Sequence, residues 1–180
     1  MTCTRPRVTM PLINHGPSRR LMAGVMRRNN IPMTYHPDMS NFTMVASGDY
    51  VRAVGWLHPE HPYPRGHACW KFRWRLRRFV RRADESTEEL GWGSFRGSHT
   101  CEFCGRGSGY RNFGVPAGGI LFVAPEMILH YVRWHRYLLP VEFIEAVLSG
   151  PLPGTAEYGR AVLCSGGAIS RSRGVVAAAM

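Results

Sequence analysis

The 180-residue chain lacks long apolar runs. Its longest apolar stretches, residues 118–125 and 127–129, fall far short of the roughly 20 residues that a membrane-spanning helix requires. Residues 21–26, near the basic N-terminus, are too few and too interrupted by glycine to serve as the apolar part of a secretory signal. An apolar content of 44% nevertheless suffices for a compact core. We therefore expect a folded protein that is neither membrane-spanning nor secreted.

Lysine is scarce, and the two ends of the chain contain no acidic residue. Lys71 is the only lysine among 23 basic residues, and residues 1–32 and 159–180 contain arginine but no acid. The net charge of +11 and the pI near 10.2 favour an acidic partner such as nucleic acid. However, the excess charge lies mainly in the two terminal regions, and a bias toward Arg, Gly and Ala is also typical of a GC-rich coding background. Nucleic-acid binding is therefore an alternative hypothesis and not the leading one.

Cysteine is also sparse, with five residues in the chain. Cys3, Cys69 and Cys164 are scattered and indicate no disulfide framework, so we expect a reducing, cytoplasmic location. The chain has no Gly-x-Ser-x-Gly motif of a serine hydrolase. The glycine-rich segment 105–109 lacks the Gly-Lys-Ser/Thr ending of a phosphate-binding loop. These absences argue against a serine hydrolase with that motif and against a nucleotide-binding enzyme with a phosphate-binding loop.

Apolar periodicity is missing from both ends of the chain. Residues 1–32 combine arginine with proline and asparagine, and residues 151–180 are rich in Gly, Ala and Pro, so both are expected to be flexible tails. The first tail resembles a transit peptide, or sequence upstream of a later start at Met33 that is not part of the native protein. A single domain is expected over residues 33–150.

The pattern within this domain predicts an α+β fold, with a small antiparallel sheet and two or three helices. β-Branched and aromatic residues indicate the strands, and apolar residues at helical spacing indicate the helices. The predicted strands span residues 42–47, 50–57, 111–115 and 120–123, and the predicted helices span 68–83, 125–139 and 141–148.

The predicted helix at 68–83 carries a basic stripe opposite its apolar face. This stripe consists of Lys71, Arg75, Arg78 and Arg82. A solvated helix face is the simpler interpretation. A nucleic-acid-binding surface, formed by the stripe together with the arginine-rich tails, is the alternative.

Two cysteines separated by two residues form the sharpest local motif. Cys101 and Cys104 are followed by Gly105, and such a spacing lets a tight turn direct both sulfurs toward one point. Two thiolates are half of the four ligands that a tetrahedral zinc ion takes. A redox pair and two unrelated buried thiols are the competing interpretations.

Two histidines on the predicted helix at 125–139 supply the remaining ligand types. His130 and His135 are separated by four residues, within the spacing that zinc fingers allow, and both can reach inward from the edges of the apolar helix face. The order of cysteine pair, two strands and helix is typical of a ββα or treble-clef-like zinc unit. His99 is the rival ligand, or a residue that orients a thiolate. We therefore predict a zinc site formed by Cys101, Cys104, His130 and His135.

Four protein ligands would leave no coordination position for water or substrate. Such a zinc ion is structural, so the leading expectation is a non-enzymatic interaction or regulatory module with a protein partner. A zinc-dependent hydrolase or deaminase is the second alternative, because His58-Pro59-Glu60 followed by Cys-x-x-Cys has the residue types of a zinc deaminase. Against it, Glu60 lies in a proline-rich loop, and Thr100 stands where the deaminase signature has proline.

Several short motifs resemble an uncharacterised bacterial family of small single-domain proteins, classed as a domain of unknown function. They are Val54-Gly-Trp-Leu57, His61-Pro-Tyr63, Gly66, His99-Thr-Cys-Glu-Phe-Cys104, Ala124-Pro-Glu-Met-Ile128, His130-Tyr-Val132, His135, Tyr137, Pro140, Phe143 and Ala146-Val147. The resemblance covers roughly residues 33–150 and places the predicted zinc ligands, with His99, at the centre of the domain. It implies no activity, substrate or catalytic residue.

Overall fold

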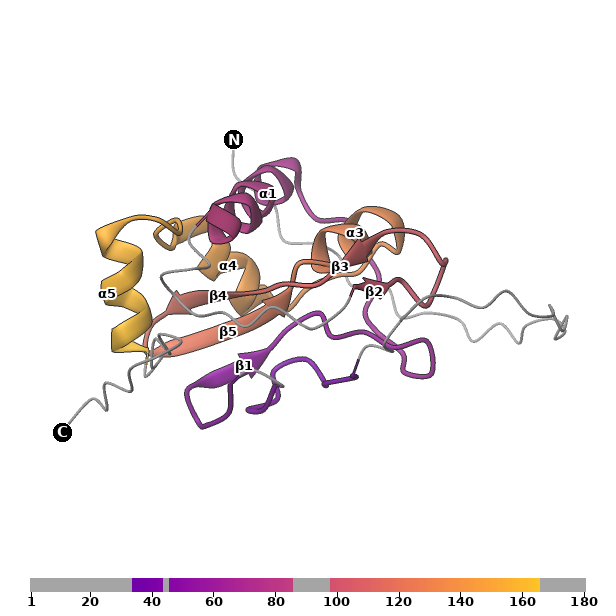
Figure 1. Ribbon diagram of the computed structural model, residues 1–180, viewed down its shortest axis with the longest axis horizontal. Helices are drawn as coiled ribbons and strands as arrows, with labels where there is room; N and C mark the ends of the chain where they lie inside the picture. Colours follow the sequence, from indigo (N-terminus) through magenta and orange to yellow (C-terminus); the bar gives the residue numbers. More distant parts are fainter. Residues whose placement is uncertain (1–33, 44–45, 86–97, 166–180) are drawn as a thin grey trace, which may run out of the picture.

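A β-hairpin at the centre of the molecule organises the fold (Figure 1). The computed structural model describes residues 34–43, 46–85 and 98–165. Strands β4 (Asn112–Ala117) and β5 (Ile120–Pro125) pair antiparallel, with Val115 opposite Phe122. Gly118 and Gly119, with φ of +54° and +81°, form the two-residue turn between them. Both residues adopt the left-handed backbone that such tight hairpin turns require, which explains the glycine pair.

A third strand, β1 (Val51–Ala53), pairs with β5 in parallel and gives the sheet the order β1-β5-β4. We expected a small antiparallel sheet; the β4–β5 pair is antiparallel, and β1 adds a parallel strand at one edge. A parallel neighbour requires a long crossover connection, and here the chain between β1 and β5 contains α1 and the cysteine pair. Of the strand predicted at 42–47, the described residues form a bridge between Phe42 and Ser47, and residues 44–45 lie outside the described part of the chain.

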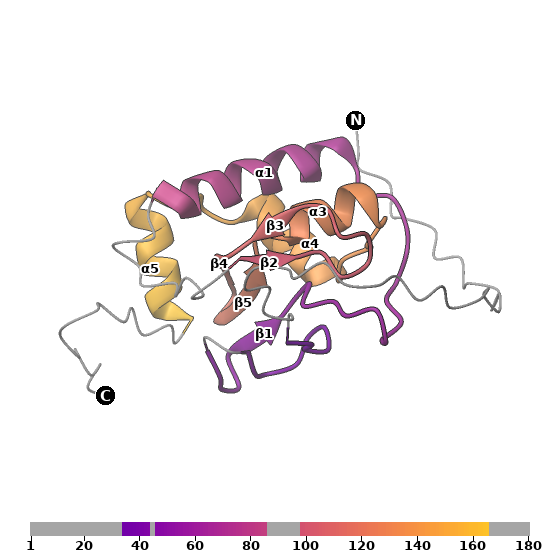
Figure 2. The same cartoon turned by 45° about the vertical axis from the view of Figure 1, so that its right-hand side comes forward.

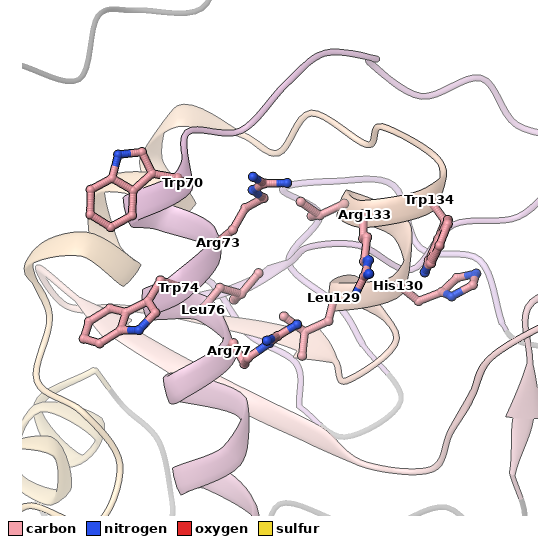
Figure 3. A pocket seen from close by; sticks show the side chains of 10 residues that line it. Trp70, Arg73, Trp74, Leu76, Arg77, Leu129, His130, Arg133 and Trp134 are labelled. Carbon is pink, nitrogen blue, oxygen red and sulfur yellow. The ribbon is translucent and has the colours of Figure 1, made fainter.

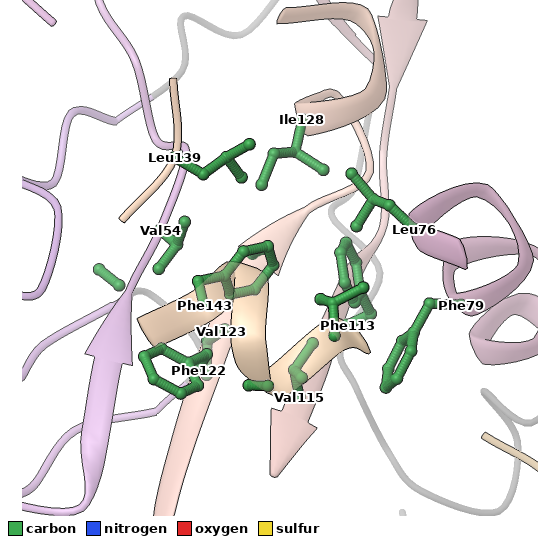
Figure 4. Close-up of a cluster of buried hydrophobic side chains, with 14 of the residues drawn as sticks. Val54, Leu76, Phe79, Phe113, Val115, Phe122, Val123, Ile128, Leu139 and Phe143 are labelled. Carbon is green, nitrogen blue, oxygen red and sulfur yellow. The ribbon is translucent and has the colours of Figure 1, made fainter. Parts of the chain in front are cut away.

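Helices pack on one another and on the hairpin to enclose the core. Helix α1 (Trp70–Glu85) contacts α3 (Ile128–Trp134) and α4 (Val141–Ser149), and both α4 and α5 (Ala156–Cys164) pack on β4. In Figures 1 and 2, α1 and β1 lie on opposite sides of the β4–β5 hairpin. The core between the helices and the hairpin is aromatic and aliphatic. Phe122 of β5 packs edge-on against Phe143 of α4, and Phe79 of α1 lies against Phe113 of β4 (Figure 4). Helices α1 and α4 agree with the predicted ranges.

Helix α5 occupies a region expected to be a flexible tail. Thr155 caps the helix by accepting a hydrogen bond from the Tyr158 N–H, and the Tyr158 hydroxyl donates to the Gly114 carbonyl over 2.7 Å. Tyr158 and Val162 are buried in the core. The sequence signal was weak because a short helix with only two buried positions follows a segment rich in proline and glycine.

Helix α3 is shorter than predicted and ends at Trp134, not Leu139. Arg136 adopts a left-handed backbone with φ of +54°, which stops the helix. The proline-rich loop then binds the released backbone: the Gly66 N–H donates to the Arg136 carbonyl, and the Leu138 N–H donates to the Pro64 carbonyl. Pairing with a segment distant in sequence therefore overrides the helical pattern.

The α+β class is confirmed, with four helices in the part of the chain that the structure describes. None of these is long and apolar enough to cross a membrane. A small second sheet, formed by β2 (His99–Thr100) and β3 (Ser108–Gly109), carries the cysteine pair between its strands. The tail expected at residues 1–32 lies outside the described residues, as does the end of the C-terminal tail from residue 166.

Candidate metal centre

Cys101 and Cys104 lie on a tight turn between β2 and β3, which we name the cysteine turn (residues 101–107). The Gly105 N–H donates to the Cys101 carbonyl over 2.7 Å, and the Cys101 N–H donates to the Gly107 carbonyl over 3.1 Å. Gly105 and Gly107 both have left-handed backbones, with φ of +67° and +73°. These bonds bring the chain back on itself and direct both sulfurs toward α3.

His130 lies within α3, and His135 is the first residue after it. The two histidines were expected on one continuous helix, and the early end of α3 corrects that expectation. The left-handed Arg136 follows His135, and the Tyr137 N–H donates to the Tyr131 carbonyl to close the helix end. The two imidazoles nevertheless meet, with 3.2 Å between their Nε2 atoms.

The structure brings all four predicted ligands together. Each cysteine sulfur lies 3.3 Å from one histidine Nε2, Cys101 beside His135 and Cys104 beside His130. All four donor atoms lie within 4.8 Å of one another. Around a tetrahedral ion with zinc-like bond lengths, neighbouring sulfur and nitrogen ligands are about 3.6 Å apart and two nitrogens about 3.3 Å apart. The cluster therefore has the size and the donor types to hold a metal ion.

Burial affects the proton affinity of the cluster. Burial lowers the pKa of His130, and the neighbouring His135 lowers it further. Burial is also the main reason that the pKa of His135 is lowered, and the charge of Arg65 adds to the decrease. Both imidazoles therefore favour the neutral form that binds metal. Burial also raises the pKa of the Cys101 thiol, although backbone N–H groups of the turn oppose this increase. A bound cation would favour the Cys101 thiolate, the form that binds metal.

Phe103, between the two cysteines, anchors the cysteine turn to the rest of the domain. Its ring lies 5.1 Å from that of His135 and packs edge-on against Tyr63 and Tyr131. The Tyr63 hydroxyl donates to the His135 carbonyl over 3.3 Å. These contacts connect the proline-rich loop, the cysteine turn and the end of α3 around one point.

The backbone of Gly107 packs against the ring of His130. A Cβ atom at this position would lie 2.7 Å from Nδ1 of His130 and 3.1 Å from Cε1 of the same ring. No such contact is tolerated, so the histidine ring packs directly on the backbone of the cysteine turn. The glycine pair of the turn therefore serves two purposes, backbone conformation and close approach to His130.

The rival candidates lie outside the cluster. His99 is buried in β2 and is not among the four clustered donors. His58, the histidine of the deaminase-like motif, places Nε2 3.2 Å from a carboxylate oxygen of Glu102. Glu60 is exposed, with 82% of its side-chain surface accessible. The deaminase-like arrangement of histidine, glutamate and two cysteines is thus not formed.

The four residues of the basic stripe do not form an open row of cations. The Arg75 guanidinium donates to the carbonyls of Val147 and Gly150, at the end of α4, over 2.7 and 2.6 Å. Arg78 stacks over the ring of Trp74 at 4.7 Å. Lys71 is exposed and Arg82 is half-buried on the same side of α1. Arg75 in particular joins two helices and is a structural residue.

The half-buried carboxylate of Asp38 was not predicted from the sequence. The Tyr137 hydroxyl lies 2.8 Å from both carboxylate oxygens of Asp38, and the Gly55 N–H donates to the same group over 3.0 Å. Burial raises the pKa of Asp38, and these hydrogen bonds oppose the increase. Asp38 stands in a segment without strand or helix periodicity, so no local signal predicted it.

The fold and the cluster define a small α+β domain with a Cys₂His₂ cluster that can hold a metal ion. A model of the family described as a domain of unknown function (DUF7919) matches residues 34–148, and the chain belongs to this family. The resemblance to an uncharacterised domain family is thereby confirmed. No curated protein matches the chain, and no solved structure matches it.

Proposed function

We propose that Cys101, Cys104, His130 and His135 bind one structural Zn²⁺ ion in a non-enzymatic, cytoplasmic interaction module. The observation that carries this proposal is the closed donor set, in which two sulfurs and two nitrogens lie at ligand-to-ligand distances. Thiolate and imidazole are the ligands that structural zinc sites use. Four protein ligands leave no position at which water or substrate can be activated.

The position of the cluster supports a structural role. It connects the cysteine turn, which lies in the small sheet β2–β3, to the end of α3. Residues 104–107 of this turn are exposed, so burial contributes little to holding them in place. Zinc binding in small structural sites has an apparent free energy of about 10–16 kcal/mol, which is ample to fix such a turn.

Metal analysis of the purified full-length protein tests the proposal. We expect one zinc per chain, and a Cys101→Ser, Cys104→Ser variant should contain none and melt at a much lower temperature. A Cys69→Ser, Cys164→Ser variant is the matched control, since these two cysteines lie outside the cluster. It should retain the zinc. Absence of metal from the wild type, with normal melting of the first variant, would overturn the proposal.

Cobalt substitution distinguishes the structural site from a hydrolase or deaminase site. Co²⁺ bound by two thiolates and two imidazoles should show the absorption of a tetrahedral ion, without change when small anions are added. An exchangeable water on the cobalt would show that only three protein ligands bind. That result would favour the catalytic alternative.

A further inference from the structure

A cleft between α1 and α3 lies next to the metal centre. Its volume is about 550 Å³, within the range of about 300–1,000 Å³ typical of ligand-binding clefts. Three tryptophans and three arginines define what we name the Trp/Arg cleft: Trp70, Arg73, Trp74, Arg77, Arg133 and Trp134. His130, one of the clustered donors, also lines it.

The α1 residues of the Trp/Arg cleft form one helical stripe. Positions 70, 73, 74 and 77 follow the spacing i, i+3, i+4 and i+7, which places them on one face of a helix. This stripe differs from the basic stripe predicted from the sequence, which contains Arg75 and Arg78. In Figure 3, Trp70 and Trp74 lie on one side of α1 and Trp134 lies on α3, with the arginine side chains between them.

The indole rings of the Trp/Arg cleft are exposed to an unusual degree. The exposed fractions are 67% for Trp70, 55% for Trp74 and 64% for Trp134. Large aromatic side chains are normally buried, and an exposed group of them marks a binding surface. None of the three rings contributes to the buried core described above.

The charge of the cleft is of one sign. Arg73, Arg77 and Arg133 are exposed, and none of the described residues that line the cleft is acidic. Arg133 lies 4.9 Å from the centre of the Trp134 ring, so a cation and an aromatic face are presented together. An anionic ligand with flat aromatic groups matches this combination of charges and rings.

We propose that the Trp/Arg cleft binds single-stranded nucleic acid, with bases stacked on the indole rings and phosphates paired with the arginines. Single-stranded binding sites combine a positive groove with aromatic stacking surfaces. Duplex DNA keeps its bases inside the helix and cannot use three exposed indoles in this way. The inference goes beyond the proposed zinc role by assigning a nucleic-acid partner, the alternative to the protein partner expected from the sequence. It rests on the metal centre only in that α3 carries both sites.

Fluorescence anisotropy of a labelled 12-nucleotide oligothymidylate, with the full-length protein, tests this proposal. Trp74→Ala, Trp134→Ala removes two of the three stacking rings without changing charge, and we expect the Kd to rise about tenfold or more. Because both rings are exposed, this variant should retain its zinc and its melting temperature. Phe42→Ala, an exposed aromatic outside the cleft, is the matched control and should leave the Kd unchanged.

An arginine variant tests the ionic part of the site. Arg73→Gln, Arg77→Gln should reduce the slope of log K against log salt concentration by about 1.4, since each phosphate contact on a single strand contributes about 0.7. Arg160→Gln, on α5 and outside the cleft, is the control for the loss of one charge. It should change this slope by much less than the roughly 0.7 expected for one phosphate contact.

Three results would overturn the proposal. One is equal affinity for a duplex of the same length, and another is an unchanged Kd in the tryptophan variant, since both indicate attraction by charge alone. The third is displacement of the oligonucleotide by poly-glutamate as effective as that by unlabelled oligothymidylate. Zinc analysis of the same preparations separates the two proposals. Oligonucleotide binding without zinc refutes the metal role alone, and zinc without oligonucleotide binding refutes this inference alone.

Discussion

The β4–β5 hairpin and the cysteine turn are held in place by different interactions. Ten of the twelve hairpin strand positions are buried, and Phe122 packs against Phe143 of α4. The cysteine turn is largely exposed and depends on a few backbone hydrogen bonds, the Phe103 contacts and the four clustered donors. Apolar burial therefore stabilises the first region, and the metal would stabilise the second.

The two regions meet at α3. Ile128 and Tyr131 are buried in the core, while His130 and the adjacent His135 contact the two cysteines. A helix of seven residues is short for independent stability. The position of α3 is therefore determined both by the apolar core and by the metal centre, and each of these two regions can be perturbed separately.

Metal removal should produce the largest difference between the regions. Chelation of the purified protein removes an interaction of about 10 kcal/mol or more in comparable sites. Hydrogen exchange should then accelerate in residues 99–110 and 128–137, while β4 and β5 stay protected. Mass spectrometry of peptide fragments measures both. Uniform deprotection, including the hairpin, would show that the core has no stability of its own, and no change anywhere would mean that metal does not hold the turn.

A cavity in the apolar core should have the opposite effect to metal removal: it should weaken the core and leave metal binding intact. Phe143 is fully buried, and Phe143→Ala should lower the free energy of unfolding by about 3–5 kcal/mol through lost burial and an unfilled cavity. The native state that remains should still bind one zinc per chain. Leu163→Ala, on α5 and exposed by 58%, is the control and should change stability by less than about 0.5 kcal/mol. Denaturant unfolding and metal analysis would be performed together, and loss of zinc in the native Phe143 variant would contradict the separation of the regions.

The same contrast explains what could be predicted from the sequence. The hairpin, α1 and α4 follow from local apolar patterns, because burial decides their structure. The four donors were also identified from their spacing. The end of α3 was not, since it depends on pairing of residues 136–138 with residues 64–66. Neither the Asp38 contacts nor the Trp/Arg cleft could be predicted, because both join segments that are far apart in sequence.

Gly107 offers a smaller and more local perturbation. Gly107→Ala introduces both a strained left-handed backbone, costing about 1–2 kcal/mol, and a collision with the His130 ring. Mutation of residues that hold a metal ligand in place typically lowers metal affinity about 10–100-fold, and we expect a decrease of this size when the His130 ring is displaced. Competition with a chromophoric chelator measures this affinity.

Gly105→Ala separates the two effects of the Gly107 variant. Gly105 has a similar φ of +67°, but a Cβ there would meet no atom within 4 Å. It should therefore cost similar backbone strain with a much smaller loss of metal affinity. Equal losses in the two variants would show that backbone strain, and not contact with His130, controls the site.

The smallest expected effect is the decrease in stability at acidic pH that arises from His36, a buried residue. His36 is buried between Phe42 and Trp56, and burial lowers its pKa below the ordinary 6.5. The unfolded chain therefore binds a proton at His36 at a higher pH than the folded chain. Stability is unaffected above pH 6.5 and falls as the pH decreases below it, by at most about 1.4 kcal/mol per pH unit. His36→Phe should remove this part of the dependence.

Protonation of His130 and His135 also contributes to acid sensitivity, because metal binding requires neutral imidazoles. The two contributions are separated by comparing His36→Phe with the wild type after chelation, when no metal competes for protons. We expect the difference in unfolding free energy between the two proteins to change only below about pH 6.5, where the wild type loses stability relative to the variant. A difference that is constant from pH 5 to pH 8 would show that His36 is protonated equally in the folded and unfolded chains, and that burial in this part of the core does not disfavour its charge.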